Sequence, residues 1–179
     1  MRVLKIVTML TLASVVARPS LSAQAPKSGW RAEFLSNFDD SEKKYVALAE
    51  AMPWEKFSWR PAKGVRSVCE VYLHIAGANY LFGAPLGAKV PAGIDVNKIE
   101  TCPGSKAQVL ATMKASFAYM KNAVNATPDA ASDGMVELFG AKMTKRALLL
   151  GAAEHAGEHL GQSIAYARTN GVVPPWSKS

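Results

Sequence analysis

Apolar residues recur at steps of three, four and seven over four stretches of this chain, a spacing that places them on one face of an α-helix. The first stretch, 30–52, stops at Pro53, which cannot continue a helix. The fourth, 144–170, is followed by Gly171, a residue suited to the position just past a helix end. No stretch shows a sustained alternation of apolar and polar residues. The pattern therefore predicts an all-α fold, most simply a four-helix bundle.

Two short motifs mark where the second and third helices begin. Ser67 is followed three residues later by Glu70, and Ser105 is followed three residues later by Gln108. A serine with Glu or Gln at this distance is typical of a capping box, in which each residue bonds the backbone of the other. We therefore expect the second helix over about 67–83 and the third from residue 105 onwards.

The connection between these two helices, from about Gly83 to Gly104, exceeds the ~12–15 residues usual in compact domains. Such a connection can return along a helix of ~16 residues, which is about 24 Å long. Helices two and three would then run in the same direction, in an up-down-down-up bundle with a long crossover. This topology brings Cys69 and Cys102 to the same end, where they form either a disulfide or two buried thiols.

Residues 1–23 have the layout of a secretory signal peptide: a basic start, an apolar run over 6–16 and small residues before a cleavage site after Ala23. The apolar run is shorter than the ~20 residues that span a bilayer, and an uncleaved anchor is the alternative. We expect one mature domain, 24–179, that is periplasmic or secreted and not stably inserted in the membrane after cleavage.

The formal net charge of +7 overstates the basic character of the mature domain. Three basic residues and no acidic ones lie within 1–23, so cleavage leaves about +4. The remaining Lys and Arg are interspersed with acidic residues, whereas a nucleic-acid groove needs a dense basic patch with stacking aromatics. We therefore expect no nucleic-acid partner.

The only three histidines of the chain form the pattern that points most clearly to chemistry. His155 and His159 are four residues apart in the fourth helix and so share one face, and His74 lies in the second helix. Three imidazoles from facing helices can hold one cation and leave coordination positions open. Imidazole binds zinc, nickel, copper, iron and cobalt, so the residues leave the metal open. Three hydrogen-bonded core histidines are the alternative.

Polar neighbours of the histidines are candidates to orient the rings. Glu158 follows His155 by three residues, Gln162 follows His159 by three, and Asn79 lies on the helix of His74. Metal-bound histidines usually donate their second N–H to such groups. The glutamate directly precedes the second histidine, so the H-E-x-x-H arrangement of metalloproteases does not apply. No G-x-S-x-G motif is present, so serine hydrolysis is not supported.

Several segments resemble one known family. Residues 66–79, with Trp-Arg-Pro at 59–61 before them, resemble the second helix of DinB-like proteins, also called the DinB/YfiT group. Residues 154–162 and 168–175 are similar to the last helix and tail of that family. Together these segments frame nearly all of the mature chain. One departure is Leu160, which occupies a position where a basic residue is frequent.

The resemblance implies a four-helix bundle with a crossover, a divalent metal held by His74, His155 and His159, and frequent homodimers. Zinc, nickel, manganese or iron are the expected cations. The group includes metal-dependent thiol transferases and isomerases, and members described as hydrolases. We therefore expect an exported hydrolase or thiol S-transferase in which the metal activates water or a thiol for attack on an unidentified small molecule. Export argues against the transferase, since low-molecular-weight thiols are scarce outside the cytoplasm. A non-catalytic bundle that binds a metal or a small ligand is the alternative.

Overall fold

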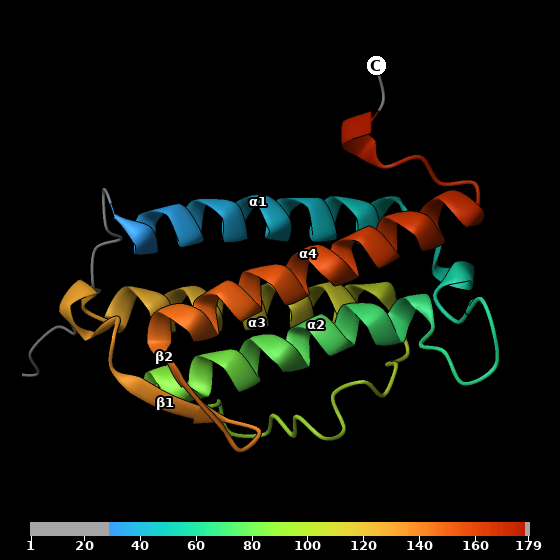
Figure 1. Cartoon of the computed structure of the whole chain (residues 1–179). Helices are drawn as coiled ribbons and strands as arrows, with labels where there is room; N and C mark the ends of the chain where they lie inside the picture. Colours follow the sequence, from blue (N-terminus) through green and yellow to red (C-terminus); the bar gives the residue numbers. More distant parts are fainter. Residues whose placement is uncertain (1–28, 178–179) are drawn as a thin grey trace, which may run out of the picture.

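Four long helices form the bundle of the computed structural model, which describes residues 29–177 (Figure 1). The expected signal peptide, 1–23, lies outside the described residues. The long helices are α1 (Trp30–Ala51), α2 (Val68–Gly83), α3 (Lys106–Ala126) and α4 (Lys145–Thr169). Short 3-10 helices lie at η1 (Trp54–Lys56), η2 (Ala84–Leu86), η3 (Asp129–Ala131) and η4 (Pro175–Ser177).

Helices α2 and α3 run in the same direction, and α1 and α4 run in the opposite one (Figure 1). The residues that contact each other occur in the same order along α2 and α3, as they do when two helices run in the same direction. Asn79 donates to the Ser116 hydroxyl at 3.1 Å, and one turn further Gly83 lies against the Tyr119 ring. The segment between the two helices therefore crosses the length of the bundle, which is the path that its length predicts.

The predicted caps explain why the helices begin where they do. Ser67 and Glu70 form a complete capping box: the Ser67 hydroxyl accepts from the Glu70 N–H, and the Glu70 carboxylate accepts from the Ser67 N–H at 2.6 Å. At the start of α3 only one of the two capping hydrogen bonds is formed. The Ser105 hydroxyl accepts from the Gln108 N–H, but it also donates to the Gln108 side chain, which therefore does not cap the serine backbone.

A two-stranded hairpin corrects the all-α prediction. Strands β1 (Met135–Leu138) and β2 (Ala141–Thr144) pair antiparallel between η3 and α4. Each strand has only four residues, too few for a period-two pattern to stand out from its surroundings. The two-residue turn, Phe139-Gly140, has positive φ at both positions, where Asn-Gly is the usual sequence. The hairpin therefore lacked both sequence signals by which such elements are found.

An aromatic layer fills the centre of the bundle. The rings of Tyr45, Tyr72 and Phe117 come from three different helices and are fully buried. A buried hydroxyl needs a partner, and Tyr45 donates to the Ala156 carbonyl of α4 at 2.7 Å. This bond joins α1 to α4 beside His155.

The crossover segment, 87–105, is attached to α2 by a covalent bond and by close packing. Cys102 forms a disulfide with the buried Cys69 near the start of α2. Further along, Ile99 packs so closely on α2 that a Cβ at Gly77 would lie 2.8 Å from its methyl group. A glycine at position 77 therefore permits the segment to lie against the helix.

None of the helices over residues 29–177 combines the length and the apolarity needed for a membrane span.

Removal of the disulfide should destabilise the domain substantially. The bridge closes a loop with a sequence separation of 33 residues. Loop-closure entropy for this length corresponds to about 3–4 kcal/mol of unfolding free energy. Urea unfolding of the oxidised protein and of the Cys69→Ala/Cys102→Ala variant measures the difference. A loss below about 1 kcal/mol would show that noncovalent contacts alone hold the crossover segment.

Candidate metal centre

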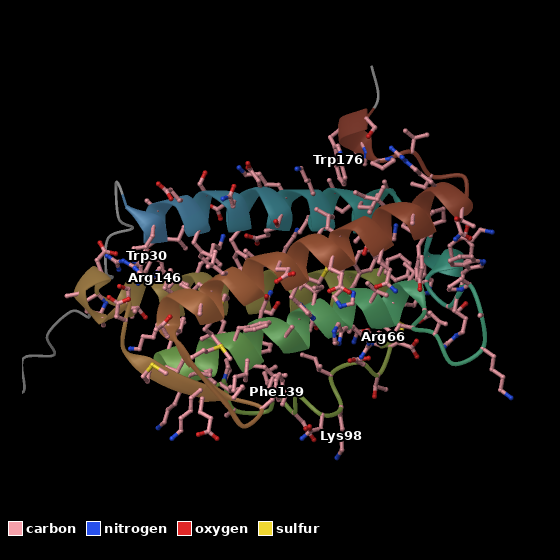
Figure 2. The ribbon with its side chains drawn as sticks, viewed as in Figure 1. Trp30, Arg66, Lys98, Phe139, Arg146 and Trp176 are labelled. Atoms are coloured by element: carbon pink, nitrogen blue, oxygen red, sulfur yellow. A yellow bond between two sulfur atoms is a disulfide. The ribbon has the colours of Figure 1, made fainter. Side chains whose placement is uncertain are left out.

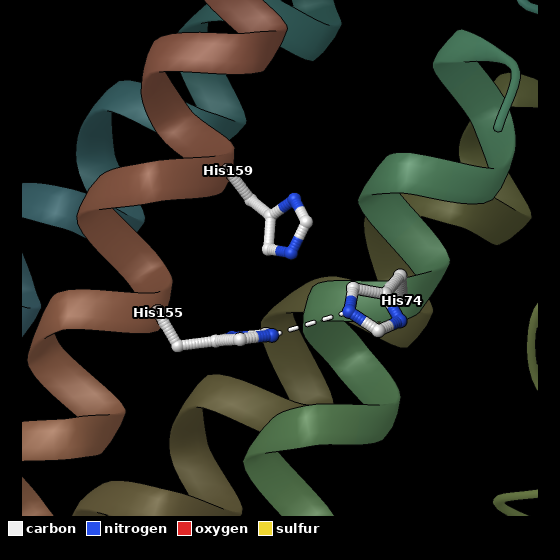
Figure 3. Close-up of side chains that lie close together, drawn as sticks. All are labelled: His74, His155 and His159. Carbon is white, nitrogen blue, oxygen red and sulfur yellow. Dashed lines mark hydrogen bonds between the residues drawn. The ribbon is translucent and has the colours of Figure 1, made fainter. Parts of the chain in front are cut away.

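His74 from α2 meets His155 and His159 from α4 (Figure 3). One ring nitrogen from each residue lies within 4.8 Å of the others. The Nε2 atoms of His74 and His155 are 3.1 Å apart. All three residues are half-buried, so the cluster lies at the edge of the bundle interior and keeps access to solvent. The structure thus brings together the three residues predicted to hold a metal.

A carboxylate from the crossover segment holds the His74 ring. Glu100 Oε1 lies 2.7 Å from His74 Nδ1, and Arg66 binds the same carboxylate through two nitrogens, at 2.7 and 3.1 Å. Burial favours the neutral acid, but the bonds from Arg66 and His74 outweigh it and lower the pKa of Glu100. An ionised carboxylate can only accept, so His74 carries its proton on Nδ1 and has a lone pair on Nε2.

A second chain of hydrogen bonds holds the His159 ring. The Arg66 carbonyl can only accept, so the Tyr166 hydroxyl donates to it at 3.2 Å. That hydroxyl in turn accepts from Gln162 Nε2 at 2.9 Å, which turns Gln162 Oε1 toward His159 Nδ1 at 2.7 Å. His159 must therefore be protonated on Nδ1, and in the neutral ring it is Nε2 that carries the lone pair.

Both chains of hydrogen bonds end at Arg66. Its side chain supports the chain that holds His74, and its carbonyl supports the chain that holds His159. Two Nε2 lone pairs thus point into the space between the rings. His155 Nε2 donates a hydrogen bond to one of these lone pairs, the one on His74 Nε2. The described polar contacts leave His155 Nδ1 without a protein partner, so this ring can change tautomer and present a third lone pair. Three neutral imidazoles fit a divalent cation with open positions.

The surroundings favour the neutral form of two of the imidazoles, those of His74 and His155. Burial, followed by the proximity of His159 and His74, lowers the pKa of His155 to about 4. Burial also lowers the pKa of His74, although its bond to Glu100 opposes the shift. The neutral ring is the form that ligates a metal, so protons compete weakly for these nitrogens near neutral pH.

The polar residues expected to orient the rings have different positions in the structure. Gln162 bonds His159, as its spacing predicts. Glu158 is exposed and makes no hydrogen bond or ion pair among those described, so no contact supports its predicted role. Asn79 is buried, but its described hydrogen bond is a donation to Ser116 of α3 and not a contact with a histidine.

Sequence reasoning missed Glu100, the partner of His74. Glu100 lies in irregular structure, where no periodicity relates it to a helix face. A signal was nevertheless present: Cys102 stands two residues after Glu100, and Cys69 stands five before His74. Bonding the two cysteines brings the glutamate close to the histidine.

Two cavities adjoin the cluster from different sides. One is a polar depression of about 580 Å³ lined by Arg60, Arg66, Glu70, Glu100 and Gln162 among others. The other, of about 190 Å³, is mainly apolar and has His74, His155 and Glu100 in its wall. The smaller cavity therefore places open space against two of the three histidines, and the larger one lies against the residues that hold two of the rings.

Comparison with protein families identifies the class of this protein. The model of the DinB superfamily matches residues 37–163, which include all three histidines. The chain belongs to the DinB superfamily, as its resemblance predicts.

Solved structures show the same fold. A DinB-like protein from Bacillus cereus ATCC 10987 has a TM-score of 0.69 and 19% identity, covering 79% of this chain and 93% of its own. A DinB-like protein from Bacillus subtilis has a TM-score of 0.62 and 22% identity, covering 78% and 92%. A comparison with curated proteins gives no match.

The titration of His155 in the metal-free protein tests the burial of the cluster. Its midpoint is expected at about pH 4, against an ordinary value of 6.5. The unfolded chain takes up this proton near pH 6.5, so the contribution of neutral His155 to stability is present above that pH and is lost as the pH falls toward 4. Long-range ¹H–¹⁵N NMR measures the midpoint. Titration near pH 6.5 would show an open, solvated cluster.

Proposed function

We propose that this protein is an exported, metal-dependent enzyme that acts on a small molecule at His74, His155 and His159. The observation that carries the proposal is the donor set itself. Hydrogen bonds fix two of the three imidazoles with a lone pair facing the others, and the third lies 3.1 Å from its neighbour. A bound divalent cation there would supply Lewis acidity, which activates a water or a thiol for attack on an electrophile.

The two adjoining cavities support catalysis over simple metal storage. A structural site is normally closed by four protein ligands, whereas a catalytic one keeps an open position. Here the described residues offer three clustered ligands, and the apolar cavity has two of them in its wall. Glu100 and Gln162, which hold two of the rings, line the polar depression, and mainly apolar side chains line the other cavity.

Export is proposed from the N-terminal sequence and is supported by the disulfide. Disulfides persist in the periplasm and outside the cell but are rare in the cytosol. The Cys69–Cys102 bridge therefore fits an oxidising compartment. Hydrolysis with an activated water is then favoured over thiol transfer, because water is the nucleophile that such a compartment always provides.

Metal analysis of the purified protein tests the shared site. We expect one divalent cation per chain by elemental analysis. Each of His74→Ala, His155→Ala and His159→Ala should weaken metal affinity more than about 100-fold, because loss of an outer partner alone costs about 10–100-fold. Glu158→Ala, an exposed change next to His159, is the matched control and should leave affinity unchanged. Equal affinity in all four variants would contradict the site.

Turnover by the metal-loaded protein then separates an enzyme from a binder. Ester, amide and thiol-conjugation substrates should be converted by the metal-loaded protein and not by His155→Ala. Full metal occupancy without turnover across such a panel would identify a binding protein instead.

The role assigned to Glu100 gives a sharper prediction. Glu100→Gln keeps the size of the side chain but removes the charge that fixes the His74 tautomer. Metal affinity should fall about 10–100-fold, as is typical when an outer partner of a ligating histidine is changed. Glu70→Gln is the control, since this nearby carboxylate bonds Ser67 and Arg60 but no histidine. Competition with a chromophoric chelator measures both, and equal affinities would show that Glu100 does not act on the site.

A further inference from the structure

The smaller cavity beside the histidines, here called the apolar cleft, has features that metal binding alone does not require. His74 and His155 form part of its wall. Most of the rest is apolar and comes from three different parts of the chain. These parts are α2 with Leu81 and Phe82, the crossover segment with Val96 and Ile99, and the hairpin with Phe139.

Phe139 is the most unusual residue of this lining. The residue is 82% exposed, although a phenyl ring in water is unfavourable. Its φ of 51° lies in the left-handed region, which a bulky residue rarely adopts and which Asn or Gly would occupy at lower cost. Figure 2 shows Phe139 at the tip of the hairpin beside α2 and the crossover segment. Strain of this kind persists mainly where a residue has a function.

The polar depression is a weaker candidate for selecting a ligand. Its two arginines are already paired, Arg60 with Glu70 and Arg66 with Glu100. They therefore offer no unpaired charge to an anionic group. The apolar cleft, in contrast, is lined by an exposed aromatic residue and by two of the three clustered histidines.

We propose that the apolar cleft binds the aromatic or branched aliphatic group of a small ligand whose donor atom reaches the cation, with Phe139 covering that group. This inference rests on the proposed function, because it assigns the substrate class of the same site. The cleft holds about 190 Å³, and an engineered apolar cavity of about 150 Å³ binds benzene. The selected group is therefore about the size of a phenyl ring with a short substituent.

Hydroxamates of increasing size test the cleft, because each carries the same metal-binding head. Calorimetric titration of the zinc-loaded protein with acetohydroxamate, butyrohydroxamate and benzohydroxamate gives three affinities. Each methylene buried in the cleft should tighten binding about fourfold, and the phenyl group should tighten it at least about tenfold. Equal affinity for all three probes would overturn the proposal.

Two variants locate the effect. Phe139→Asn should reduce the benzohydroxamate advantage about 2- to 12-fold through loss of the aromatic contact, while the melting temperature stays equal or rises because Asn suits a positive φ. Val96→Trp should fill the cleft from the crossover segment and abolish the advantage. Leu150→Gln, which removes an exposed apolar side chain of α4 outside the cleft, is the matched control. An advantage that is unchanged in Phe139→Asn and Val96→Trp would overturn the proposal.

Failure of the metal site is distinguishable from failure of the cleft. If the protein binds no metal, acetohydroxamate will not bind either, and the proposed function is wrong. Ligand-observed NMR with toluene and the metal-free protein then tests the cleft alone. Toluene binding that is lost in Val96→Trp supports the cleft, and no binding, or binding that this variant does not change, overturns it.

Discussion

The hydrogen bond from the Tyr166 hydroxyl to the Arg66 carbonyl joins the last turns of α4 to the residue before the α2 cap. Such a bond contributes only about 1 kcal/mol to stability, but it is compatible with only one register between the two helices that carry all three histidines. Each residue along a helix turns the side chain by about 100°. A slip of α4 by one residue would therefore remove His155 and His159 from the ring that faces them.

Arg66 also shows that an interaction can matter little for stability and much for a site. Its ion pair with Glu100 is well exposed, with side chains 42% and 38% accessible, and pairs of this kind contribute about 0–1 kcal/mol. The pair matters because it positions the Glu100 carboxylate. It keeps the carboxylate ionised and in place, and the carboxylate keeps the proton of His74 on the nitrogen that faces away from the other rings. The Arg66 carbonyl likewise keeps the proton of His159 on Nδ1, through Tyr166 and Gln162.

The elements that local patterns specify could be predicted from the sequence, and those that depend on tertiary contacts could not. Helices, their caps and the facing histidines follow from spacing within about one turn. Glu158 and Gln162 have the same spacing from a histidine, yet only Gln162 bonds one. Gln162 has Tyr166 one turn further to hold its amide, whereas the residue one turn beyond Glu158 is Gln162, which is already engaged. Glu100 depends on where the crossover segment returns to α2, which no local pattern encodes, and the hairpin has short strands and a turn without the usual Asn-Gly signal.

The disulfide has a consequence for how this protein is prepared. Cys102 stands two residues after Glu100, so oxidation of two thiols also fixes the carboxylate that orients His74. Material produced in a reducing cytoplasm reaches its final shape without that covalent tie, and its histidines lose part of their support. Formation of the disulfide thus completes the support of the histidine cluster. Samples prepared under oxidising and reducing conditions therefore differ at this site.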